Sequence, residues 1–379
     1  MSIKSKFYKL EENEFKEYLS HIKNTPDTMF FLQKEYFYSP NQTTNKKMLE
    51  LNSLQYEFDF LVQSFSEFGK RQLLQGFMID DIVSTNGIES IQSTRHDIFY
   101  CMNQLNRKKN DTITSIVNTY ELLIKSGGIE IHSHNDVCRI YDFIMKGVLD
   151  KKDQPDGLYY RKSDVFITDG LKVIHSGLKG EGMIMEAMDA FIELYNSCLN
   201  VYEKMILCHF ILESIHPFYD GNGRLGRCLF SNGIYLNTDS YFSFLISKAI
   251  LNQKNKYYKA FKDTEDIHEY GCLNGFVESI SSILMDELKD EINEITEKRQ
   301  RIQNLQIVSD LTASEQKIYA LLAETTILSY FGISNEEIIN ELNISKRTLM
   351  YALKKFREKD LLIETKVGKF NFIKLKNIE

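Results

Sequence analysis

Proline is scarce in this chain, and this scarcity constrains its fold more than any other feature of the sequence. Only 4 of the 379 residues are proline. An interior proline breaks an α-helix because it lacks the N–H donor and its ring clashes with the preceding turn. Apolar residues also recur at helical spacing, which predicts helices at residues 51–68, 113–124, 183–194, 202–215 and 276–307. We therefore predict a mainly α-helical fold.

The composition excludes several other classes of protein. The formal net charge is −7, and 43% of the residues are hydrophobic, which argues against a disordered chain and against a basic coat for nucleic acid along the whole chain. No run of about 18 apolar residues predicts a membrane-spanning helix, and the N-terminus lacks the apolar core of a signal peptide. The 6 cysteines form no Cys-x-x-Cys pair, so we expect buried or half-buried single thiols in a cytoplasmic protein without membrane contact.

One short segment interrupts the helical pattern. Residues 165–167 (VFI) and 172–174 (KVI) flank Asp169-Gly170. Asp-Gly between short β-branched runs predicts a β-hairpin. A lone hairpin among helices is marginally stable unless it packs on something, and its exposed edge is a candidate docking surface.

The last 70 residues have a different pattern. Helices are predicted at residues 312–323, 334–342 and 346–359, followed by strands at 362–364 and 371–374, which is the order of a winged helix-turn-helix domain. From Lys346 onward, ten basic residues face four acidic ones. This basic face is capable of contacting DNA; the alternatives are a contact with protein or a solvated helix face on a packing or dimerisation module.

Residues 216–227 (HPFYDGNGRLGR) carry the densest chemical signal in the sequence. One helix is predicted to end at His216, and the next to begin at residues 222–224. The glycines between them allow backbone N–H groups to approach an anion, and the N-terminus of the second helix favours phosphate. Arg224 and Arg227 lie three residues apart on one face of that helix, where both present forked donors.

Two further side chains in this segment suit phosphate chemistry. Asp220 is a hard carboxylate that can hold Mg²⁺ between phosphates, and His216 can act as a general base near pH 7. Phe218 is expected to anchor the segment in the core. The sequence lacks the Gly-x-x-x-x-Gly-Lys-Ser/Thr pattern of a P-loop. We therefore predict a site of phosphoryl or nucleotidyl transfer of another kind.

The same twelve residues resemble a known motif. They match every fixed position of the Fic family motif, His-x-Phe-x-Asp/Glu-Gly-Asn-Gly-Arg-x-x-Arg. Residues 157–161 (GLYYR) and His175 are similar to the approach to the family's flap hairpin, and Tyr257-Tyr258 is similar to its paired tyrosines. Residues 176–178 (SGL) depart from the Pro-Pro that many relatives carry after this histidine.

The resemblance implies a domain organisation. We expect an N-terminal helical region at 1–110, a Fic catalytic core with a small β-hairpin flap at 111–290, a helical connector at 291–309 and a winged-helix domain at 310–379. Fic relatives include dimers, so a homodimer is possible.

The resemblance also implies an activity, namely that of a bacterial protein adenylyltransferase that transfers AMP from ATP to a Tyr, Thr or Ser hydroxyl. The acceptor would belong to a protein target docked on the hairpin at 165–175, or to the chain itself. His216 would be the base and Asp220 the Mg²⁺ ligand. Glycine at position 223, where the Doc kinase-like branch has lysine, favours AMP transfer. The implied nucleotide-binding residues are Lys172, Val173, Ile174, His175, Gly221, Asn222, Gly223, Arg224, Leu225, Gly226, Arg227 and Tyr257.

Residues 84–90 (STNGIES) resemble the inhibitory motif of one Fic class, Ser/Thr-x-x-x-Glu-Gly/Asn. Thr85 and Glu89 fit this pattern, and Ser90 departs from it. The resemblance implies that Glu89 pairs with Arg227 and occupies the place of the γ-phosphate. Inhibition would then act within one chain.

Two other interpretations remain open. The chain could be a winged-helix DNA-binding regulator whose Fic core only senses nucleotide, or a Fic enzyme that transfers UMP, phosphate or phosphocholine, or removes AMP. His132 and His134 are expected to be surface residues rather than metal ligands, and His209 a packed core residue.

Overall fold

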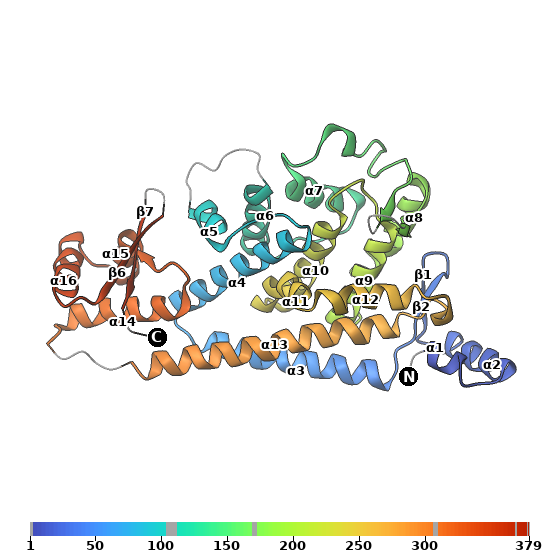
Figure 1. The fold of residues 1–379 in the computed structure, drawn as a ribbon, viewed down its shortest axis with the longest axis horizontal. Helices are drawn as coiled ribbons and strands as arrows, with labels where there is room; N and C mark the ends of the chain where they lie inside the picture. The colour runs from blue at the N-terminus through green and yellow to red at the C-terminus, as the bar shows by residue number, and fades with distance from the viewer. Residues whose placement is uncertain are drawn as a thin grey trace. The chain divides into compact units, whose positions relative to one another are not determined.

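The structure, a computed structural model, describes residues 3–103, 112–168, 173–305, 310–367, 370–376 and 378. The chain divides into two compact units, Met1–Gln55 with Asp81–Glu287 (unit 1) and Tyr56–Asp80 with Leu288–Glu379 (unit 2). The helices α3 (Gln42–Gln63), α4 (Glu67–Ile88) and α13 (Asn274–Gln303) continue from one unit into the other (Figure 1). The predicted, mainly helical fold is confirmed, while the predicted domain boundaries at 110, 290 and 309 stay predictions.

The single helix predicted at residues 51–68 is wrong, because the chain turns there between α3 and α4. The Ser64 hydroxyl donates to the Leu61 carbonyl oxygen, and the Ser66 hydroxyl oxygen accepts the Gly69 N–H at 2.9 Å. Serine at a helix end bonds the backbone in this way and so competes with helix continuation. Apolar periodicity alone did not reveal the break.

Unit 1 is built around α9 (Val201–Ile215) and α10 (Asn222–Thr238), which pack on each other. Thirteen of the fifteen residues of α9 are buried, as expected for a helix that is apolar on all sides. α6 (Thr112–Ser126), α7 (His134–Met145) and α8 (Gly180–Tyr195) pack in sequence beside this pair. The loop between α9 and α10 carries residues 216–221, so the core of unit 1 positions the predicted site.

The remaining elements of unit 1 surround this core. They are α1 (Ile3–Phe7), α2 (Glu12–Lys23), β1 (Met29–Phe31), β2 (Tyr36–Tyr38), α5 (Arg95–Asn103), η1 (Lys151–Asp153), η2 (Tyr241–Leu245), α11 (Ile246–Asn252), α12 (Lys254–Thr264) and η3 (Ile267–Glu269). β1 and β2 form an antiparallel hairpin that the sequence analysis did not predict.

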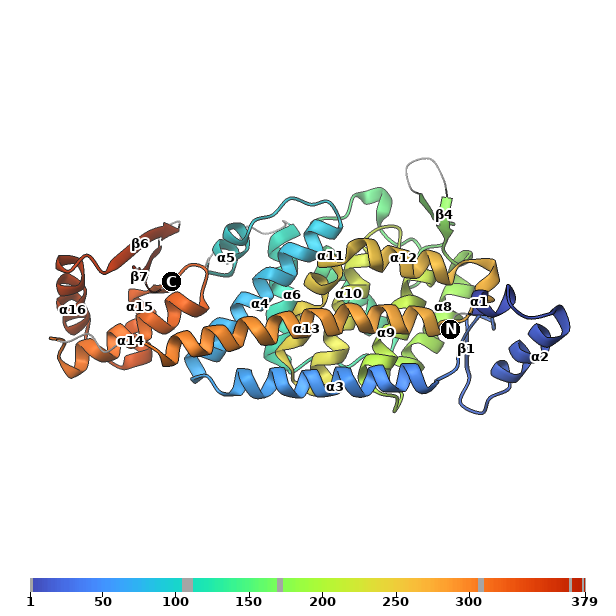
Figure 2. The ribbon, with the colours of Figure 1, turned by 60° about the horizontal axis from the view of Figure 1, so that its bottom comes forward.

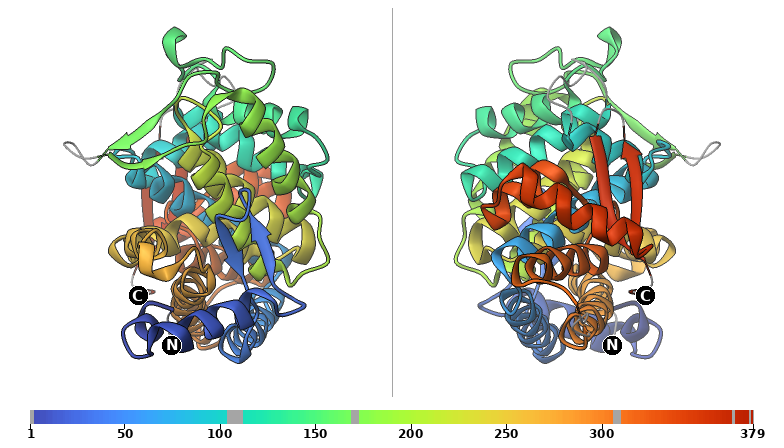
Figure 3. Two further views of the ribbon diagram at one scale, coloured as in Figure 1. Left: turned by 90° about the vertical axis from the view of Figure 1, so that its right-hand side faces the viewer. Right: turned by 90° about the vertical axis from the view of Figure 1, so that its left-hand side faces the viewer.

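The predicted interior hairpin is present. β3 (Phe166–Thr168) pairs antiparallel with β4 (Val173–Ser176), and the register shifts between residues 167 and 168. The hairpin projects away from the helices of unit 1, as two viewing directions show (Figures 2 and 3). The Asp169-Gly170 turn lies outside the described residues.

The C-terminal part of unit 2 has the predicted order of elements. α14 (Ala313–Leu328), α15 (Asn335–Leu342) and α16 (Lys346–Glu358) precede β6 (Leu362–Val367) and β7 (Phe370–Leu375). A short strand, β5 (Ile333–Ser334), completes a sheet of order β5-β7-β6. The three helices are capped, because the side chains of Thr312, Ser334 and Ser345 each accept a backbone N–H three residues on.

These elements also pack on the other segment of unit 2. Phe68 of α4 belongs to the same apolar core as Leu322 and Phe356. The Tyr330 hydroxyl donates to the Asp80 carboxylate at 2.7 Å. The first turns of α4 are therefore held by the C-terminal elements.

Two expectations from the composition concern membrane-spanning helices and cysteines. Among the described residues, no helix is long and apolar enough to cross a membrane. All six cysteines are free thiols and four of them are buried, but Cys198 is exposed, which corrects the expectation of buried or half-buried thiols at this position. Cys198 lies in the turn between α8 and α9, where the chain meets solvent.

Replacing Ile338 by alanine is predicted to destabilise the C-terminal elements. Ile338 is fully buried against α16 and β7 in the apolar core of unit 2, and such a truncation costs about 2–5 kcal/mol. Hydrogen exchange of the α15 and α16 amides should accelerate accordingly. The exposed neighbour Asn340 provides the control, because Asn340→Ala should change stability by less than about 0.5 kcal/mol.

Candidate active site

His216 lies at the C-terminal end of α9 in a strained backbone conformation. Its φ is 51° and its ψ is 63°, in the left-handed region, which costs a residue with a Cβ about 1–2 kcal/mol. The side chain is half-buried at the entrance of the loop. A strained backbone conformation persists only where the surrounding contacts enforce it. The contacts around His216 therefore determine where its imidazole lies.

Arg161 provides these contacts. Its guanidinium is fully buried, and its Nε donates to the His216 carbonyl oxygen at 2.8 Å. Its other nitrogens donate to the carbonyl oxygens of Ser163, at 2.7 Å, and Leu178, at 2.8 Å. Arg161 therefore ties the strained histidine to both ends of the segment that carries the β3–β4 hairpin.

The segment 176–178, which departs from the family pattern, packs directly on the end of α9. The Leu178 N–H donates to the Ile215 carbonyl oxygen at 3.1 Å. A Cβ on Gly177 would lie 2.4 Å from Arg161 Nη2 and 3.0 Å from the His216 Cβ. Glycine is therefore required for this close approach.

The loop between α9 and α10 is fixed from within. The Asn222 amide accepts the Phe218 N–H at 3.0 Å and donates to the Phe218 carbonyl oxygen at 2.9 Å. Phe218 is buried, as predicted, and its ring stacks on Tyr141 at 3.6 Å between centroids. The Tyr141 hydroxyl donates to the Asp220 carbonyl oxygen at 3.0 Å. These contacts fix the conformation of the loop, in which the Gly221 N–H donates to the Asp220 carboxylate at 2.7 Å.

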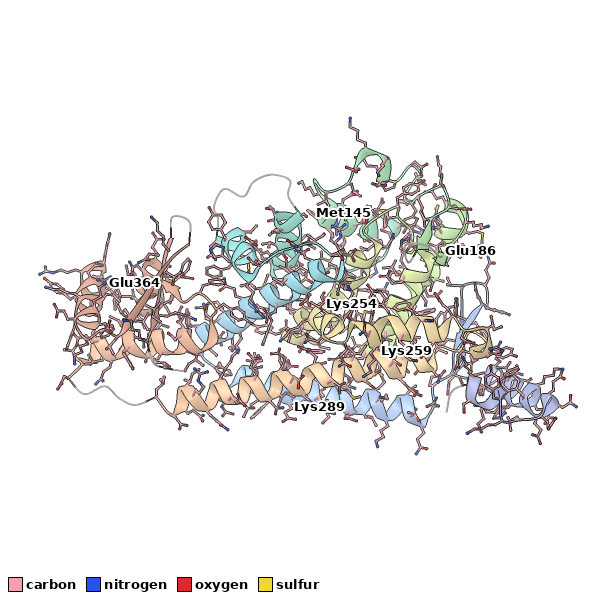
Figure 4. The ribbon with its side chains drawn as sticks, viewed as in Figure 1. Met145, Glu186, Lys254, Lys259, Lys289 and Glu364 are labelled. Atoms are coloured by element: carbon pink, nitrogen blue, oxygen red, sulfur yellow. The ribbon has the colours of Figure 1, made fainter. Side chains whose placement is uncertain are left out.

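Gly221 allows the tight start of α10. Its φ is 79°, and an added Cβ would lie 2.5 Å from the sulfur of Met145, at the end of α7 (Figure 4). α10 then begins at Asn222, as predicted. The positive end of its dipole points at the loop, where an anion is favoured.

Arg224 has unused donors. Its side chain is 5% exposed, and its Nη2 lies 3.5 Å from the Asp220 carboxylate. Within the described residues, its buried Nε and Nη1 have no hydrogen-bond partner. Buried guanidinium nitrogens nearly always have acceptors, so Arg224 suits a phosphate group of a ligand.

Arg227 is held by both residues of the predicted inhibitory motif. Its Nη2 donates to Glu89 Oε1 at 2.6 Å, and its Nε donates to the Thr85 hydroxyl at 2.9 Å. The arginine side chain is 3% exposed and the glutamate 28%. Burial is the largest single influence and lowers the pKa of Arg227, but the charge of Glu89, together with smaller contributions from Tyr257 and Glu213, leaves the pKa raised. The predicted pair between Glu89 and Arg227 is therefore present.

The glutamate also lies over a glycine in the first turn of α10. A Cβ built on Gly223 would lie 2.7 Å from Glu89 Oε1 and 3.1 Å from Arg227 Nη1. The carboxylate of Glu89 thus reaches the first turn of α10, where the anion site is expected.

The helix that leads to Glu89, α4, is anchored about two turns earlier by Asp81. This carboxylate is fully buried and accepts the backbone N–H groups of Ser247, at 2.6 Å, and Lys248, at 3.2 Å, at the start of α11. It also accepts the Tyr120 hydroxyl. Burial raises the pKa of Asp81 to about 6, against these hydrogen bonds, which lower it. Sequence reasoning assigned no role to Asp81.

The C-terminal end of α4 is capped around Ser90. Ser90 has φ 60°, and the Ile91 N–H donates to the Asn86 carbonyl oxygen at 2.8 Å, which is the longer bond of a Schellman cap. The Nζ of Lys254, labelled in Figure 4, donates to the Ile88 carbonyl oxygen at 3.3 Å. This geometry explains why Gly or Asn is usual in the family at the place of Ser90, because both tolerate positive φ.

Tyr257 lies in the interior next to His209. Its side chain is 5% exposed, and its hydroxyl lies 2.8 Å from His209 Nε2. Burial, followed by the charge of Arg227, lowers the pKa of His209 to about 3, so His209 stays neutral and Arg227 keeps its positive charge without a charged imidazole beside it. His209 is the packed core residue that the sequence predicts, while the contact of Tyr257 with adenine stays a prediction.

The remaining predicted site residues do not present a described side chain at the surface of the loop. Leu225 is buried in the core, and Gly226 faces His209 and Glu213, so the structure does not bring their side-chain positions to the loop surface. Lys172 lies outside the described residues, and so do the side chains of Val173, Ile174 and His175.

Asp220 is the predicted Mg²⁺ ligand. Its side chain is 53% exposed, and the described residues contain no cluster of three or more His, Cys, Asp or Glu side chains that could hold a metal ion. Mg²⁺ commonly takes one or two carboxylates together with water and substrate phosphates. A single exposed carboxylate beside an anion site fits that mode of binding. Of the two histidines expected not to bind metal, His132 is exposed, whereas the His134 side chain, at the start of α7, is only 14% exposed and its Nε2 lies 3.0 Å from the Asp189 carboxylate.

Part of the chain that contains this site matches a known protein family. Residues 131–232, which span α7 to the middle of α10, match the model of the Fic/DOC family. This agrees with the resemblance of residues 216–227. The match covers the strained histidine, the loop and both arginines.

Two relatives extend the comparison. The chain is 34% identical over 110 residues to a probable protein adenylyltransferase from Aquifex aeolicus, and this match covers 24% of the chain and one third of the relative's length. The structure superimposes on that of a Fic family protein from Desulfovibrio desulfuricans G20 with a TM-score of 0.53, at 17% identity over 86% of this chain and 96% of that one. The chain therefore shares the fold of a Fic family protein.

Replacing Ser90 by glycine is predicted to stabilise the end of α4. The left-handed conformation of this residue should cost glycine about 1 kcal/mol less than serine. Hydrogen exchange at residues 86–91 should slow by roughly fivefold. Gln92→Gly is the control, because Gln92 is exposed and has no positive φ, and unchanged exchange in Ser90→Gly would contradict the strain.

His209 is predicted to make stability depend on pH. With a native pKa of about 3 and an unfolded value near 6.5, the unfolded chain takes up a proton between these values that the native chain does not. Stability is therefore lost as the pH falls, by about 2 kcal/mol between pH 7 and pH 5. Unfolding midpoints of wild type and His209→Gln should show that only wild type has this contribution, and parallel pH profiles would contradict it.

Proposed function

We propose that this protein is a protein adenylyltransferase whose activity is restrained by Glu89. The observation that carries the proposal is the arrangement at the start of α10. There the helix begins directly after the loop that follows His216, two buried nitrogens of Arg224 have no partner among the described residues, and Glu89 holds Arg227. The match to the Fic/DOC family and the similarity to a probable adenylyltransferase support it.

The chemistry follows from the positions of these groups. His216 takes the proton of the target hydroxyl, and the hydroxyl oxygen forms a bond to the α-phosphorus of ATP. The bond from that phosphorus to the oxygen bridging to the β-phosphate breaks, and its electron pair leaves with pyrophosphate. The loop N–H groups bind the phosphate oxygens on which charge develops.

The two arginines bind the outer phosphates. Arg224 offers two donors that lack partners, and Arg227 would offer the donors that Glu89 and Thr85 now occupy. Forked guanidinium donors match phosphate oxygens well. Asp220 would hold Mg²⁺, which neutralises phosphate charge when bound.

Glu89 restrains this reaction by competing with the nucleotide for Arg227. The carboxylate and a phosphate require the same donor, and both cannot bind it at once. ATP that enters with Glu89 in place lacks one of its two arginines and lies with its α-phosphorus out of line. The signal that withdraws Glu89 would have to break one charge-assisted hydrogen bond, worth about 1.5–3 kcal/mol.

We further propose that the target adds a strand to the edge of the β3–β4 hairpin, at residues 165–175. Arg161 connects this hairpin to the backbone of His216, so a docked strand would be presented to the base. Self-modification would use the same route. The four buried free thiols fit a reducing compartment, and we place the protein in the cytoplasm on that ground.

The restraint is tested by transfer of AMP from α-labelled ATP. Glu89→Gly should increase incorporation by about tenfold to a hundredfold, as expected for loss of one charge-assisted hydrogen bond. His216→Ala in the same background should reduce it by about a hundredfold or more. Glu186→Gly removes an exposed glutamate of α8 (Figure 4) and should leave incorporation unchanged.

A binding measurement separates restraint from transfer. Without Glu89 the buried Arg227 lacks its counter-charge, so ATP should raise the unfolding temperature of Glu89→Gly more than that of wild type. Equal incorporation by wild type and Glu89→Gly would contradict the restraint. Label transferred from γ-labelled ATP or from UTP, but not from α-labelled ATP, would contradict AMP transfer.

A further inference from the structure

We propose that the exposed face of α16 binds double-stranded DNA. This face, which we call the basic face, consists of Lys346, Arg347, Met350, Tyr351 and Lys354, and all five residues are exposed. They are spaced three or four residues apart, so they lie on one side of the helix. The proposal concerns unit 2 and stands apart from AMP transfer.

The basic face cannot turn inward, because the opposite face of α16 is packed. Leu349, Leu353 and Phe356 are fully buried in the apolar core of unit 2 with residues of α14, α15 and β7. Ser345 caps the helix by accepting the Thr348 N–H. The helix is therefore fixed, with its N-terminal half presented to solvent.

The acidic residues of this region are occupied elsewhere. Glu315 pairs with Lys355 at 2.8 Å, and Glu364 pairs with Arg357 at 2.7 Å. Near the end of β7, Lys376 pairs with Asp360, and Glu364 is visible on β6 in Figure 4. These pairs neutralise the C-terminal half of α16 and its surroundings.

The cations of the basic face have weaker or no acidic partners. Among the described residues, no carboxylate forms an ion pair with Lys346 or Arg347, and Lys354 has only Glu358 at 3.9 Å. The positive charge that remains is thus concentrated on the first two turns of α16. An unneutralised basic stripe on one helix is the electrostatic footprint of a nucleic-acid site.

The apolar members of the face suit base edges. Tyr351 lies beside Arg347, with the guanidinium carbon 5.6 Å from the ring centroid and Nη2 3.5 Å from the hydroxyl. This contact extends the guanidinium along the helix, as needed for forked bonds to a guanine. Met350 offers an apolar contact of the kind that thymine methyl groups accept. An α-helix of this kind fits the major groove of DNA, with its N-terminal residues on the bases.

The test uses the full chain and a fluorescein-labelled 30-base-pair duplex of mixed sequence. Fluorescence anisotropy at 50–200 mM NaCl should show binding whose logarithm falls linearly with the logarithm of salt concentration. The triple variant Lys346→Gln/Arg347→Gln/Lys354→Gln should bind at least tenfold more weakly at 50 mM NaCl. Its salt slope should be smaller by about 2–3, since each phosphate contact contributes about 0.9.

A matched variant controls for net charge. Lys9→Gln/Lys46→Gln/Lys262→Gln removes three exposed lysines outside unit 2's C-terminal elements and should bind duplex as wild type does. Circular dichroism should show that both triple variants keep their helix content. AMP incorporation by the basic-face variant should equal that of wild type, so failure of this proposal and failure of the proposed function are distinguishable.

Four outcomes would overturn the proposal. They are absence of duplex binding at 50 mM NaCl, equal weakening by the two triple variants, tighter binding of a 30-nucleotide single strand than of the duplex, and tighter binding of a polyglutamate peptide than of the duplex. The last outcome would assign the basic face to an acidic protein instead.

Discussion

A buried guanidinium needs an anion, and the site depends on how Arg227 meets this requirement. With a side chain only 3% exposed, this arginine cannot rely on water to stabilise its charge. Among the described residues, the carboxylate that bonds it directly is that of Glu89, and the proposed phosphate site would supply a second anion. His209 stays neutral nearby, so no second positive charge weakens either partner. Two states of the site therefore differ in which anion Arg227 binds.

Hydrogen bonds to the backbone hold both groups that meet at Arg227. They fix the end of α4, which carries the chain to Glu89, and the loop between α9 and α10. On one side, Asp81 binds the start of α11 and Lys254 binds the last turn of α4, which fixes the approach of Glu89. On the other, Arg161 and Asn222 hold the loop through carbonyl and N–H groups. Pre-organised donors cost no rearrangement when charge develops.

Much of this site could be predicted from the sequence because its residues are close together in the chain. The helix end at His216, the turn at Gly221 and the pairing of the two arginines follow from local spacing. Glu89 required a resemblance, because nothing local indicates a partner 138 residues away. Asp81, and the backbone contacts of Arg161, were missed for the same reason: each residue looks like a surface charge, and only tertiary packing buries it.

Other parts of the fold could not be predicted from sequence patterns, for different reasons. The break between α3 and α4 depends on single hydroxyl bonds of Ser64 and Ser66, which apolar periodicity does not register. The β1–β2 hairpin is only three residues per strand and lacks an Asp-Gly or Asn-Gly turn. In unit 2, by contrast, each predicted helix began at a serine or threonine cap, and these caps are local signals.

Because Glu89 lies close to Gly223, the effect of a substitution at either position depends on the residue at the other. As long as the glutamate lies over α10, any side chain at 223 must displace it, so a mutation there is costly in one background and tolerated in another. Loss of the glutamate would lift that constraint. The effect of a substitution at 223 should therefore depend on the residue at 89, and an evolutionary path toward a larger residue at 223 would pass first through a change at 89.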